Sequence, residues 1–498
     1  MLTGLSRDDY ARASQQLQEY LRPYLTYLPP ADQETVELAF LQMVEAHAGG
    51  RRKNGDFYII HPVEACVHLT RLRLDADTLA AALLHDVPED TAVTLRELQE
   101  NFPPAVVFLV SGITKLSVLK YQGEDRYAEN LRRMFVAMSE DLRVIFIKLA
   151  DRLHNLQTLE ALPAHKARRI ALESLEIYAP IAQKLGINYF QGRLEDLAFQ
   201  YVYPAEYAEF RSHSELELVR RQKTVENIRA EVDQILLTQG LQAYDLKGRA
   251  KKYYSIYRKM QTKKLTLEQI RDLVALRIIV MDEAECYQVF ALLNKHFAVV
   301  PGTTKDYIQR PKPNGYQSLH LTVRERAGGE PVEFQIRTRA MQEFAEYGVA
   351  AHWAYKQRGR GHNAKAGASF LDAQNLKWIS ELVDLSREEM SEAEYLARVK
   401  LDLFADRIFV MTPKGDVVEL PAGATPLDFA YRIHEQIGAH ATMALVNETP
   451  MKLSGTLASG DIVEIITDKH QRPKQDWLNI VKTRSAAAQI RAGLRKLS

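Results

Sequence analysis

A histidine and three carboxylates gather at the end of an apolar run in the first hundred residues of this chain. Positions 85–91 read His-Asp-Val-Pro-Glu-Asp-Thr and directly follow the run DTLAAALL at 77–84. Because such a run predicts a buried helix, His85 and Asp86 are expected to emerge from a core element. Segments 52–62 (RKNGDFYIIHP) and 148–155 (KLADRLHN) offer further polar partners. The pattern indicates a metal site.

The residue types indicate which chemistry such a site would support. Imidazole nitrogen with carboxylate oxygen suits divalent ions such as Mn²⁺, and no thiolate accompanies these residues to select Zn²⁺. A bound ion of this kind polarises a phosphoryl oxygen and acidifies a bound water. Glu89 and Asp90 follow about one helical turn later and are expected to orient or deprotonate that water. Taken singly, each residue is more simply explained as a capping carboxylate or a core histidine, so the prediction depends on three segments in one chain. The predicted ligands are His61, His85, Asp86 and Asp151.

Length and composition bound the architecture. The 498 residues should form about three domains of ~100–200 residues each, and 46% hydrophobic with 26% charged residues are globular values. A net charge of +1 creates no global basic field, so any RNA contact must be local. Cys66 and Cys286, the only cysteines, lie far apart in apolar segments, which favours a reducing compartment. With no leader pattern and no apolar run of about 18 residues, a cytoplasmic location is expected.

The sequence pattern changes character twice along the chain. Residues 1 to about 200 show helical periodicity almost throughout. From about residue 240, β-branched runs at 273–280 (LVALRIIV) and 332–336 (VEFQI) alternate with helical ones, which predicts an α/β or α+β unit. Residues 357–369 are Gly-rich and basic, as in a flexible linker. A compact β-rich unit follows from about 406 to 468, with a helix that starts near Thr425.

The middle unit carries a second group of polar residues. Residues 248–260 hold five cations and three tyrosines, which suits a polyphosphate joined to a base. Asp272 and Glu333 are lone acids in otherwise apolar strands, and Mg²⁺ bridging nucleotide phosphates would give buried carboxylates a partner. Between them, the loop 305–320 is dense in donors and aromatic rings and could form a purine pocket. A solvated basic helix and an ordinary Pro/Gly turn explain the same spacing, and the chain has no Walker-type phosphate loop.

Several motifs, in chain order, closely resemble those of the long RelA/SpoT-family enzymes of the stringent response, and the match covers essentially the whole chain. They are RKNGDFYIIHP, HDVPEDT, KLADRLHN, GRAKKYYSIYRKM, PKPNGYQSLH, VEFQIRT and AEYGVAAHWAYK. The resemblance implies an HD-type hydrolase domain that removes the 3′-pyrophosphate of (p)ppGpp. It also implies a synthetase domain that moves pyrophosphate from ATP to the 3′-hydroxyl of GDP or GTP, followed by a TGS domain.

The same resemblance implies a multidomain α and α+β fold. An all-helical HD domain is expected at 1–195, a helical linker at 196–238, and a mixed-sheet nucleotidyltransferase-like synthetase domain at 239–356. A linker and helix should occupy 357–404, and a small β-grasp-like TGS domain 405–468. Residues 469–498 would begin a following helical region.

The family's functional residues can be carried over position by position. Its hydrolase metal ligands fall on the four residues chosen above from chemistry, and its water-activating pair falls on Glu89 and Asp90. The positions that hold the guanosine nucleotide match Arg52, Lys53, Asn155 and Thr158.

In the synthetase, Asp272 matches a Mg²⁺ ligand, and Glu333 matches the acid that helps to bind the metal and activate the 3′-hydroxyl. The ATP-side cations, which offset charge on the transferred group, match Arg249, Lys251 and Arg277. Tyr316 matches the tyrosine that stacks on guanine. The residues expected around the acceptor nucleotide are Lys305, Asn314, Gln317 and His320.

Departures from the family pattern concern specificity more than activity. Relatives without hydrolase activity lose the HDxxED residues, whereas this chain keeps them, so a bifunctional enzyme is expected. Pro88 replaces the usual aliphatic residue at a point where a helix can begin. Lys305 agrees with the bifunctional class, but Thr303 stands where Arg is common, so no preference for GDP over GTP follows. Two opposed activities in one chain require opposed control, which is expected to pass through the helices of residues 160–235.

The TGS domain of this family senses the acceptor end of uncharged tRNA on a stalled ribosome. His434, in the predicted helix DFAYRIHEQIG, matches the histidine that approaches the tRNA 3′ end, and histidine can stack on and hydrogen-bond an RNA end. A TGS domain that only restrains the catalytic half fits the sequence too.

Full-length relatives continue beyond position 498, so a truncated chain is expected. Two other functions stay open: a nucleotide hydrolase whose synthetase domain only binds, and a non-catalytic ribosome or tRNA adaptor.

Overall fold

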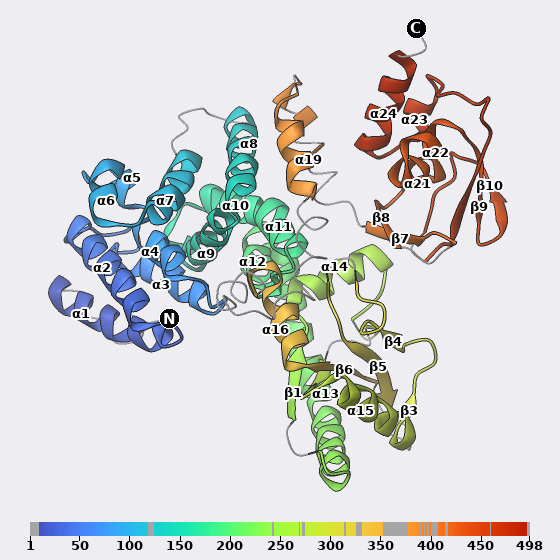
Figure 1. Cartoon of the computed structure of the whole chain (residues 1–498). Coiled ribbons are helices and arrows are strands. Elements are labelled where there is room, and N and C mark those ends of the chain that lie inside the picture. The colour runs from blue at the N-terminus through green and yellow to red at the C-terminus, as the bar shows by residue number, and fades with distance from the viewer. Residues whose placement is uncertain are drawn as a thin grey trace. The chain divides into compact units, whose positions relative to one another are not determined.

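The structure is a computed structural model of the chain (Figure 1). It describes residues 9–117, 124–241, 244–267, 269–270, 274–312, 315–324, 331–351, 377–388, 390–392, 394–395, 398–399, 407–413, 417–458 and 460–495. The backbone contacts divide the chain into two compact units, Met1–Tyr395 and Leu396–Ser498, which are described separately. Within the described ranges, no helix is both long enough and apolar enough to cross a membrane.

The first part of the larger unit is helical, as the sequence predicts. The predicted buried run at 77–84 lies in helix α4, which Asp75 begins by accepting the Thr78 amide proton at 2.8 Å. Pro88 occupies the first turn of α5, where no helical hydrogen bond is lost. The helices are α1 (Tyr10–Leu21), α2 (Pro30–Ala46), α3 (Ile60–Thr70), α4 (Ala76–Leu84), α5 (Val87–Asp90), α6 (Leu95–Asn101), α7 (Pro104–Ser117), α8 (Glu124–Glu140), α9 (Arg143–Gln157), α10 (Ala164–Glu173), α11 (Ala179–Lys184), α12 (Asn188–Val202) and α13 (Pro204–Thr238), with short turns η1 (Arg22–Leu25) and η2 (Leu159–Ala161) and a π-helical turn η3 (Ser174–Tyr178).

A six-stranded mixed sheet follows, in the order β1-β2-β6-β5-β3 with β4 against β5. β2 and β6 run parallel, and the other pairs are antiparallel. One face packs apolar side chains such as Ile278, Leu321 and Phe334 against helices α13 and α15. The predicted strands at 273–280 and 332–336 are confirmed as β2 and β6. The elements are β1 (Asp245–Ala250), α14 (Tyr253–Lys263), β2 (Val274–Val280), α15 (Glu283–His296), β3 (Ala298–Val299), β4 (Lys305–Asp306), β5 (Leu319–Arg324), β6 (Val332–Thr338), α16 (Arg339–Tyr347) and α19 (Lys377–Ser386).

Helix α12 joins the helical part to the sheet part within this unit. The Asn188 side-chain amide donates to the Ala345 carbonyl at 2.6 Å, and the Val349 amide donates to the Leu185 carbonyl at 3.0 Å. Gly348 has φ +53°, and a Cβ there would lie 2.2 Å from the Leu185 carbonyl oxygen. Only glycine therefore permits this close backbone approach.

The second unit combines short strands with helices, as expected for a small β-containing TGS domain. Thr425 and Asp428 form a capping box that begins α21, which confirms the predicted helix start. The expectation of one helix through His434 is wrong, because His434 is extended (φ −163°, ψ 141°) and its Nδ1 accepts the Gln436 amide proton to cap the next helix. The elements are β7 (Arg407–Met411), β8 (Val417–Pro421), α21 (Pro426–Ile433), α22 (Glu435–Ala439), β9 (Ala441–Val446), β10 (Thr449–Met451), β11 (Val463–Thr467), α23 (Trp477–Ile480) and α24 (Arg484–Arg495).

Candidate functional site

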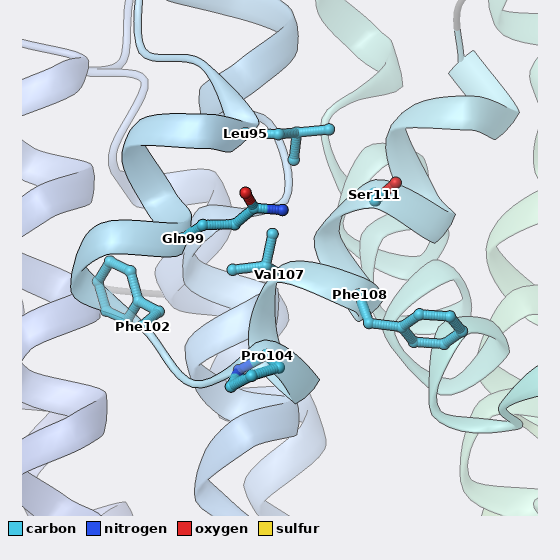
Figure 2. A pocket seen from close by; sticks show the side chains of 7 residues that line it. All are labelled: Leu95, Gln99, Phe102, Pro104, Val107, Phe108 and Ser111. Atoms are coloured by element: carbon cyan, nitrogen blue, oxygen red, sulfur yellow. The ribbon is translucent and has the colours of Figure 1, made fainter.

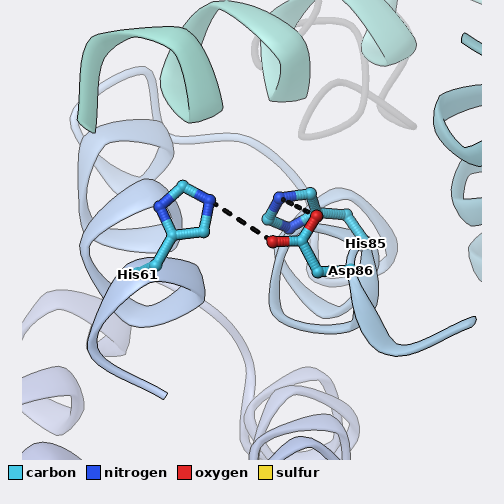
Figure 3. A group of neighbouring side chains, drawn as sticks. All are labelled: His61, His85 and Asp86. Carbon is cyan, nitrogen blue, oxygen red and sulfur yellow. Dashed lines mark ion pairs between the residues drawn. The ribbon is translucent and has the colours of Figure 1, made fainter. Parts of the chain in front are cut away.

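Three of the four predicted ligands meet where helices α3, α4 and α5 begin or end. His61 lies in the first turn of α3, His85 ends α4, and Asp86 precedes α5. One ligand atom from each lies within 4.8 Å of the others. His61 Nε2 is 3.5 Å from Asp86 Oδ2, and His85 Nε2 is 3.1 Å from Asp86 Oδ1 (Figure 3). Helix ends separated in sequence thus place two imidazoles around one carboxylate.

The fourth predicted ligand, Asp151, reaches the group through His61. Its Oδ1 lies 3.3 Å from His61 Nε2, and its Oδ2 lies 2.8 Å from the Lys148 ammonium. Asn155 also donates to Asp151 Oδ1, and Arg52 donates to the Asn155 side-chain oxygen at 2.8 Å. Positions 148, 151 and 155 share one face of α9, which explains why they converge. Asp151 is thus held from both sides before any cation binds.

The hydrogen bonds of the histidine rings test whether the group fits a cation. His85 Nδ1 lies 2.7 Å from the Ala82 carbonyl oxygen, which can only accept, so this nitrogen carries the proton. The buried Nε2 of His85 then offers a lone pair toward Asp86, and it has no hydrogen-bond partner among the described residues. A lone pair facing a carboxylate is unfavourable unless a cation lies between them. The donor set therefore fits a divalent metal.

The charges of the carboxylates favour the same conclusion. Burial alone would raise the pKa of Asp86 and Asp151, but nearby groups outweigh it. The Lys148 ammonium holds the pKa of Asp151 well below its usual value and helps to lower that of Asp86. Two ionised carboxylates beside the ring nitrogens of His61 and His85 can attract a cation.

The predicted water-activating pair lies beside this group. Glu89 is half-buried and Asp90 is exposed. The Tyr58 hydroxyl hydrogen-bonds Asp90 and lies 3.2 Å from Asp86 Oδ2, so it joins a ligand to the expected base. Burial raises the pKa of Tyr58, which keeps its proton available for donation. The His47 ring stacks on Tyr58 with centroids 4.5 Å apart.

The predicted nucleotide residues of this domain lie at the edge of the same pocket. Arg52 is half-buried, and its Nη1 atom is enclosed with no hydrogen-bond partner among the described residues. Lys53 is exposed, and Asn155 is half-buried beside Arg52. Thr158 ends α9. A buried guanidinium donor without an acceptor suits an incoming phosphate.

Strand register aligns several predicted synthetase residues across the sheet. Lys305 pairs with His320, His320 with Gln335, and Gln335 with Arg277. Directly paired residues on neighbouring strands face the same side, so the four share the face opposite the apolar core. The row explains how positions from four strands form one polar surface.

Tyr316 and Glu333 meet at this row through His320. The Tyr316 hydroxyl lies 2.9 Å from His320 Nε2, and His320 Nδ1 lies 3.5 Å from Glu333 Oε1. The expectation that Glu333 is a lone buried acid is wrong: its side chain is 22% exposed and accepts from Gln335 at 2.9 Å. Alternation along β6 puts Glu333, Gln335 and Arg337 on one polar side.

Arg337 is a site residue that the sequence analysis missed. Its side chain is fully buried, and its Nη2 donates to Gln335 Oε1 at 2.6 Å and to the Tyr316 hydroxyl at 3.1 Å. The guanidinium also lies 5.2 Å from the Tyr316 ring centroid. An arginine four residues after Glu333 in a strand was the available signal, because period two places both on one face.

The remaining predicted residues are placed less completely. Asp272 and Asn314 lie outside the described residues, as do the Arg249 side chain and the expected linker at 357–369. Lys251 is half-buried just before α14, and Gln317 donates to the Ile308 carbonyl at 3.3 Å. Thr303 donates to the Val300 carbonyl at 2.7 Å and accepts the Thr322 amide proton at 3.2 Å. Its hydroxyl is therefore engaged in hydrogen bonds to the loop backbone.

An apolar pocket of about 490 Å³ opens between α6 and α7, away from these residues (Figure 2). It contains none of the predicted site residues. Its lining residues are Leu95, Gln99, Phe102, Pro104, Val107, Phe108 and Ser111.

Three family models match successive parts of the chain. The HD domain model matches residues 39–188, the model described as a region found in RelA / SpoT proteins matches 248–360, and the TGS domain model matches 408–467. The bifunctional (p)ppGpp synthase/hydrolase SpoT of Escherichia coli K12 is 44% identical over 95% of this chain and 66% of its own length. The guanosine-3′,5′-bis(diphosphate) 3′-pyrophosphohydrolase of Aquifex aeolicus is 42% identical over 96% of this chain and 67% of its own length.

Among solved structures, small alarmone synthetase 1 from Bacillus subtilis bound to its product pppGpp is 26% identical. The match covers 38% of this chain and 93% of the synthetase chain, with a TM-score of 0.25. Fold and site define an HD-domain protein with a candidate divalent-metal centre and a mixed-sheet second domain. The chain belongs to the RelA/SpoT family. It spans 55% to 67% of the length of these curated relatives.

Proposed function

We propose that this chain is a bifunctional alarmone enzyme. It would transfer pyrophosphate from ATP to the 3′-hydroxyl of GDP or GTP, and hydrolyse (p)ppGpp to GDP or GTP and pyrophosphate. The observation that carries the proposal is the presence of two separate polar sites in one unit, each with a carboxylate: the His61, His85 and Asp86 group, and the sheet face around Glu333. The 44% identity to a protein named as a bifunctional synthase/hydrolase supports it.

For hydrolysis, we assign Mn²⁺ to the His61, His85 and Asp86 group with Asp151 as the fourth ligand. The bound ion would supply Lewis-acid polarisation of a phosphoryl oxygen. Glu89 and Asp90 orient the attacking water and take its proton. The bond between the 3′-oxygen and phosphorus breaks, which releases pyrophosphate and restores the 3′-hydroxyl. The nucleotide is held by Arg52, Lys53, Asn155 and Thr158.

For synthesis, we assign Mg²⁺ to Asp272 and Glu333. Glu333 takes the proton of the acceptor 3′-hydroxyl, whose oxygen bonds to the β-phosphorus of ATP while AMP leaves. Tyr316 stacks on guanine. The cations that offset charge on the transferred group are Arg249, Lys251 and Arg277. The other residues assigned to the acceptor nucleotide are Lys305, Asn314, Gln317 and His320.

Opposed control would pass through α12, because this helix contacts both α14 and α16 of the sheet part. Binding at one site then biases the other, and the coupling must be reciprocal. If saturating the synthetase site with ATP and GDP left the Kd for ppGpp at the hydrolase site unchanged, this form of control would be rejected. The domain boundaries given above and a cytoplasmic location belong to the same proposal.

The TGS unit would contact the 3′ end of deacylated tRNA on the ribosome through His434, whose side chain is exposed. An exposed imidazole can stack on an unpaired base or hydrogen-bond its edge. Protection of the tRNA 3′ end by wild type but not by His434→Ala, in the presence of ribosomes, would support this contact.

Nucleotide turnover by the purified chain tests the two activities. One reaction contains ATP and GDP with Mg²⁺, and another contains ppGpp with Mn²⁺. Asp86→Asn should lose hydrolysis by at least ~100-fold and keep synthesis, and Glu333→Gln should do the reverse. Hydrolysis without synthesis would favour a synthetase domain that only binds nucleotide. Absence of both would favour a non-catalytic adaptor.

A further inference from the structure

A further buried histidine, His154, lies directly behind the candidate metal centre. Nδ1 of His154, on α9, is 2.7 Å from Nδ1 of His61, and the two side chains are 7% and 1% exposed. The ring planes meet at 43°. Figure 3 shows that the second ring nitrogen of His61 points away from Asp86. His154 thus contacts the side of the ligand ring that the metal does not use.

Proton counting limits what this contact can be. Two ring nitrogens at this distance share one proton, so one donates and the other accepts. A ring nitrogen that binds a cation presents its lone pair, so the proton of that imidazole must lie on the other nitrogen. For His61 Nε2 to offer its lone pair to a cation, the His61 proton must lie on Nδ1 and be donated to His154.

We propose that His154 is a positioning residue of the metal centre, which accepts the His61 Nδ1 proton and so holds His61 in the tautomer whose Nε2 binds the cation. This inference rests on the proposed metal site. Partners of this kind, on the far nitrogen of a ligand histidine, typically change metal affinity by about 10- to 100-fold.

His154 differs in kind from the partner of the other ligand histidine. The Ala82 carbonyl can only accept, so it fixes His85 permanently in the binding tautomer. The imidazole of His154 can instead donate or accept at Nδ1. Without a cation, His61 Nε2 can donate its proton to Asp151 Oδ1, 3.3 Å away, and accept at Nδ1 from His154.

Cation binding would then exchange protons with no net change. One proton leaves His61 Nε2, the shared proton crosses between the two Nδ1 atoms, and one proton arrives at His154 Nε2. The pair therefore keeps its charge and its hydrogen bond with or without metal. A carboxylate at position 154 could serve only the metal-bound arrangement.

The affinity of the intact chain for Mn²⁺ tests this role. It can be measured without nucleotide from the electron paramagnetic resonance signal of the Mn²⁺ that stays free in solution. His154→Leu removes the acceptor and should raise the Kd by about 10- to 100-fold. His154→Asn places an amide near the position of Nδ1, and this amide can present either its oxygen or its NH₂ by rotation. It should bind Mn²⁺ within about threefold of wild type. His154→Gln places the amide too far along the side chain and should resemble leucine.

His68→Leu is the matched control. This partly buried histidine lies on the same helix as His61, but its Nδ1 pairs with the Tyr189 hydroxyl at 3.0 Å and not with a ligand. Its Mn²⁺ affinity should equal that of wild type.

Two results would overturn the proposal: unchanged affinity in His154→Leu, or an asparagine variant as weak as the leucine and glutamine variants, because packing alone would then explain the loss. If His154→Leu does not fold, the contrast between asparagine and glutamine decides. If wild type itself binds no Mn²⁺, the metal site of the proposed hydrolase fails, which is a distinct outcome.

Discussion

The two candidate sites of the larger unit differ in how they hold charge. The first site, called here the hydrolase group, consists of His61, His85, Asp86 and Asp151. It packs ionised carboxylates and imidazoles at helix ends, and these side chains are only 1% to 16% exposed. The synthetase residues lie along one polar face of a sheet, where Glu333 and His320 are 22% and 15% exposed. A buried charge needs compensation from its neighbours, whereas a partly exposed one keeps some water. Substitutions should therefore affect activity and folding together at the first site, but activity alone at most positions of the second.

Removing one lysine from each region gives the largest expected contrast. Lys148→Met leaves the buried Asp151 carboxylate without its ammonium, so the free energy of unfolding should fall by about 3–5 kcal/mol. Lys247 pairs with Asp245 in β1, but the two side chains are 68% and 38% exposed, so Lys247→Met should cost less than about 1 kcal/mol. Urea unfolding of both variants measures the difference. Equal losses would remove the distinction between the regions.

Arg337 is the exception that sharpens the comparison, because it is a fully buried cation in the synthetase region. Arg337→Met deletes the donors to Gln335 and Tyr316 and should lower kcat/KM for GDP by about 30-fold, equivalent to about 2 kcal/mol. Hydrolysis of ppGpp should not change. Arg324→Met, at the exposed end of β5, is the control. A parallel loss of hydrolysis would show that the defect is general unfolding.

A smaller change in the free energy of unfolding is expected where helix α12 contacts helix α14. Asp196, on α12, accepts the Tyr254 amide proton at 3.1 Å in the first turn of α14, whose own preceding residue Lys252 supplies no side-chain cap. Asp196→Ala should cost about 1 kcal/mol, as for a lost helix cap, and raise the KM for ATP by roughly fivefold. Asp196→Asn keeps an acceptor and should stay near wild type. An unchanged KM in the alanine variant would argue against α12 as the element that joins the two sites.

A pH-dependent change in stability is expected from His68. Burial lowers the pKa of His68 from 6.5 to about 4. Because the folded-state pKa lies below the unfolded one, the neutral ring contributes its full stability above pH 6.5 and loses it as the pH falls toward 4. The loss can reach about 1.4 kcal/mol per pH unit. His68→Gln should therefore show a shallower fall in Tm between about pH 7.5 and pH 5, whereas the exposed-site variant His165→Gln should keep the wild-type slope.

Sequence reasoning located the hydrolase group because its signal is local. His85 and Asp86 are adjacent at the end of a recognisable apolar helix, and such a helix end can only lie at the margin of the core. The partners Tyr58 and His154 were not found, because their contacts depend on how α3 packs against α5 and α9. Packing of that kind leaves no periodic signal in the sequence.

In the sheet and the smaller unit, the strands and helices could be predicted from the sequence, but their details could not. The strand around Glu333 is predictable, but in so short a run the polar alternation of Glu333 with Gln335 and Arg337 resembles a single acid among apolar residues. The helix at Thr425 begins where expected, but its end at Ile433 depends on the extended backbone of His434, a choice that local propensity does not determine.

The central claim is that the hydrolase group forms a metal site on its own, whereas the synthetase face needs nucleotide. Titration calorimetry of Mn²⁺ into the nucleotide-free chain tests it most directly. We expect one site in wild type and in Glu333→Gln, none in Asp86→Asn, and a second site only when ATP and GDP are present. A site that persists in Asp86→Asn and disappears in Glu333→Gln would contradict it.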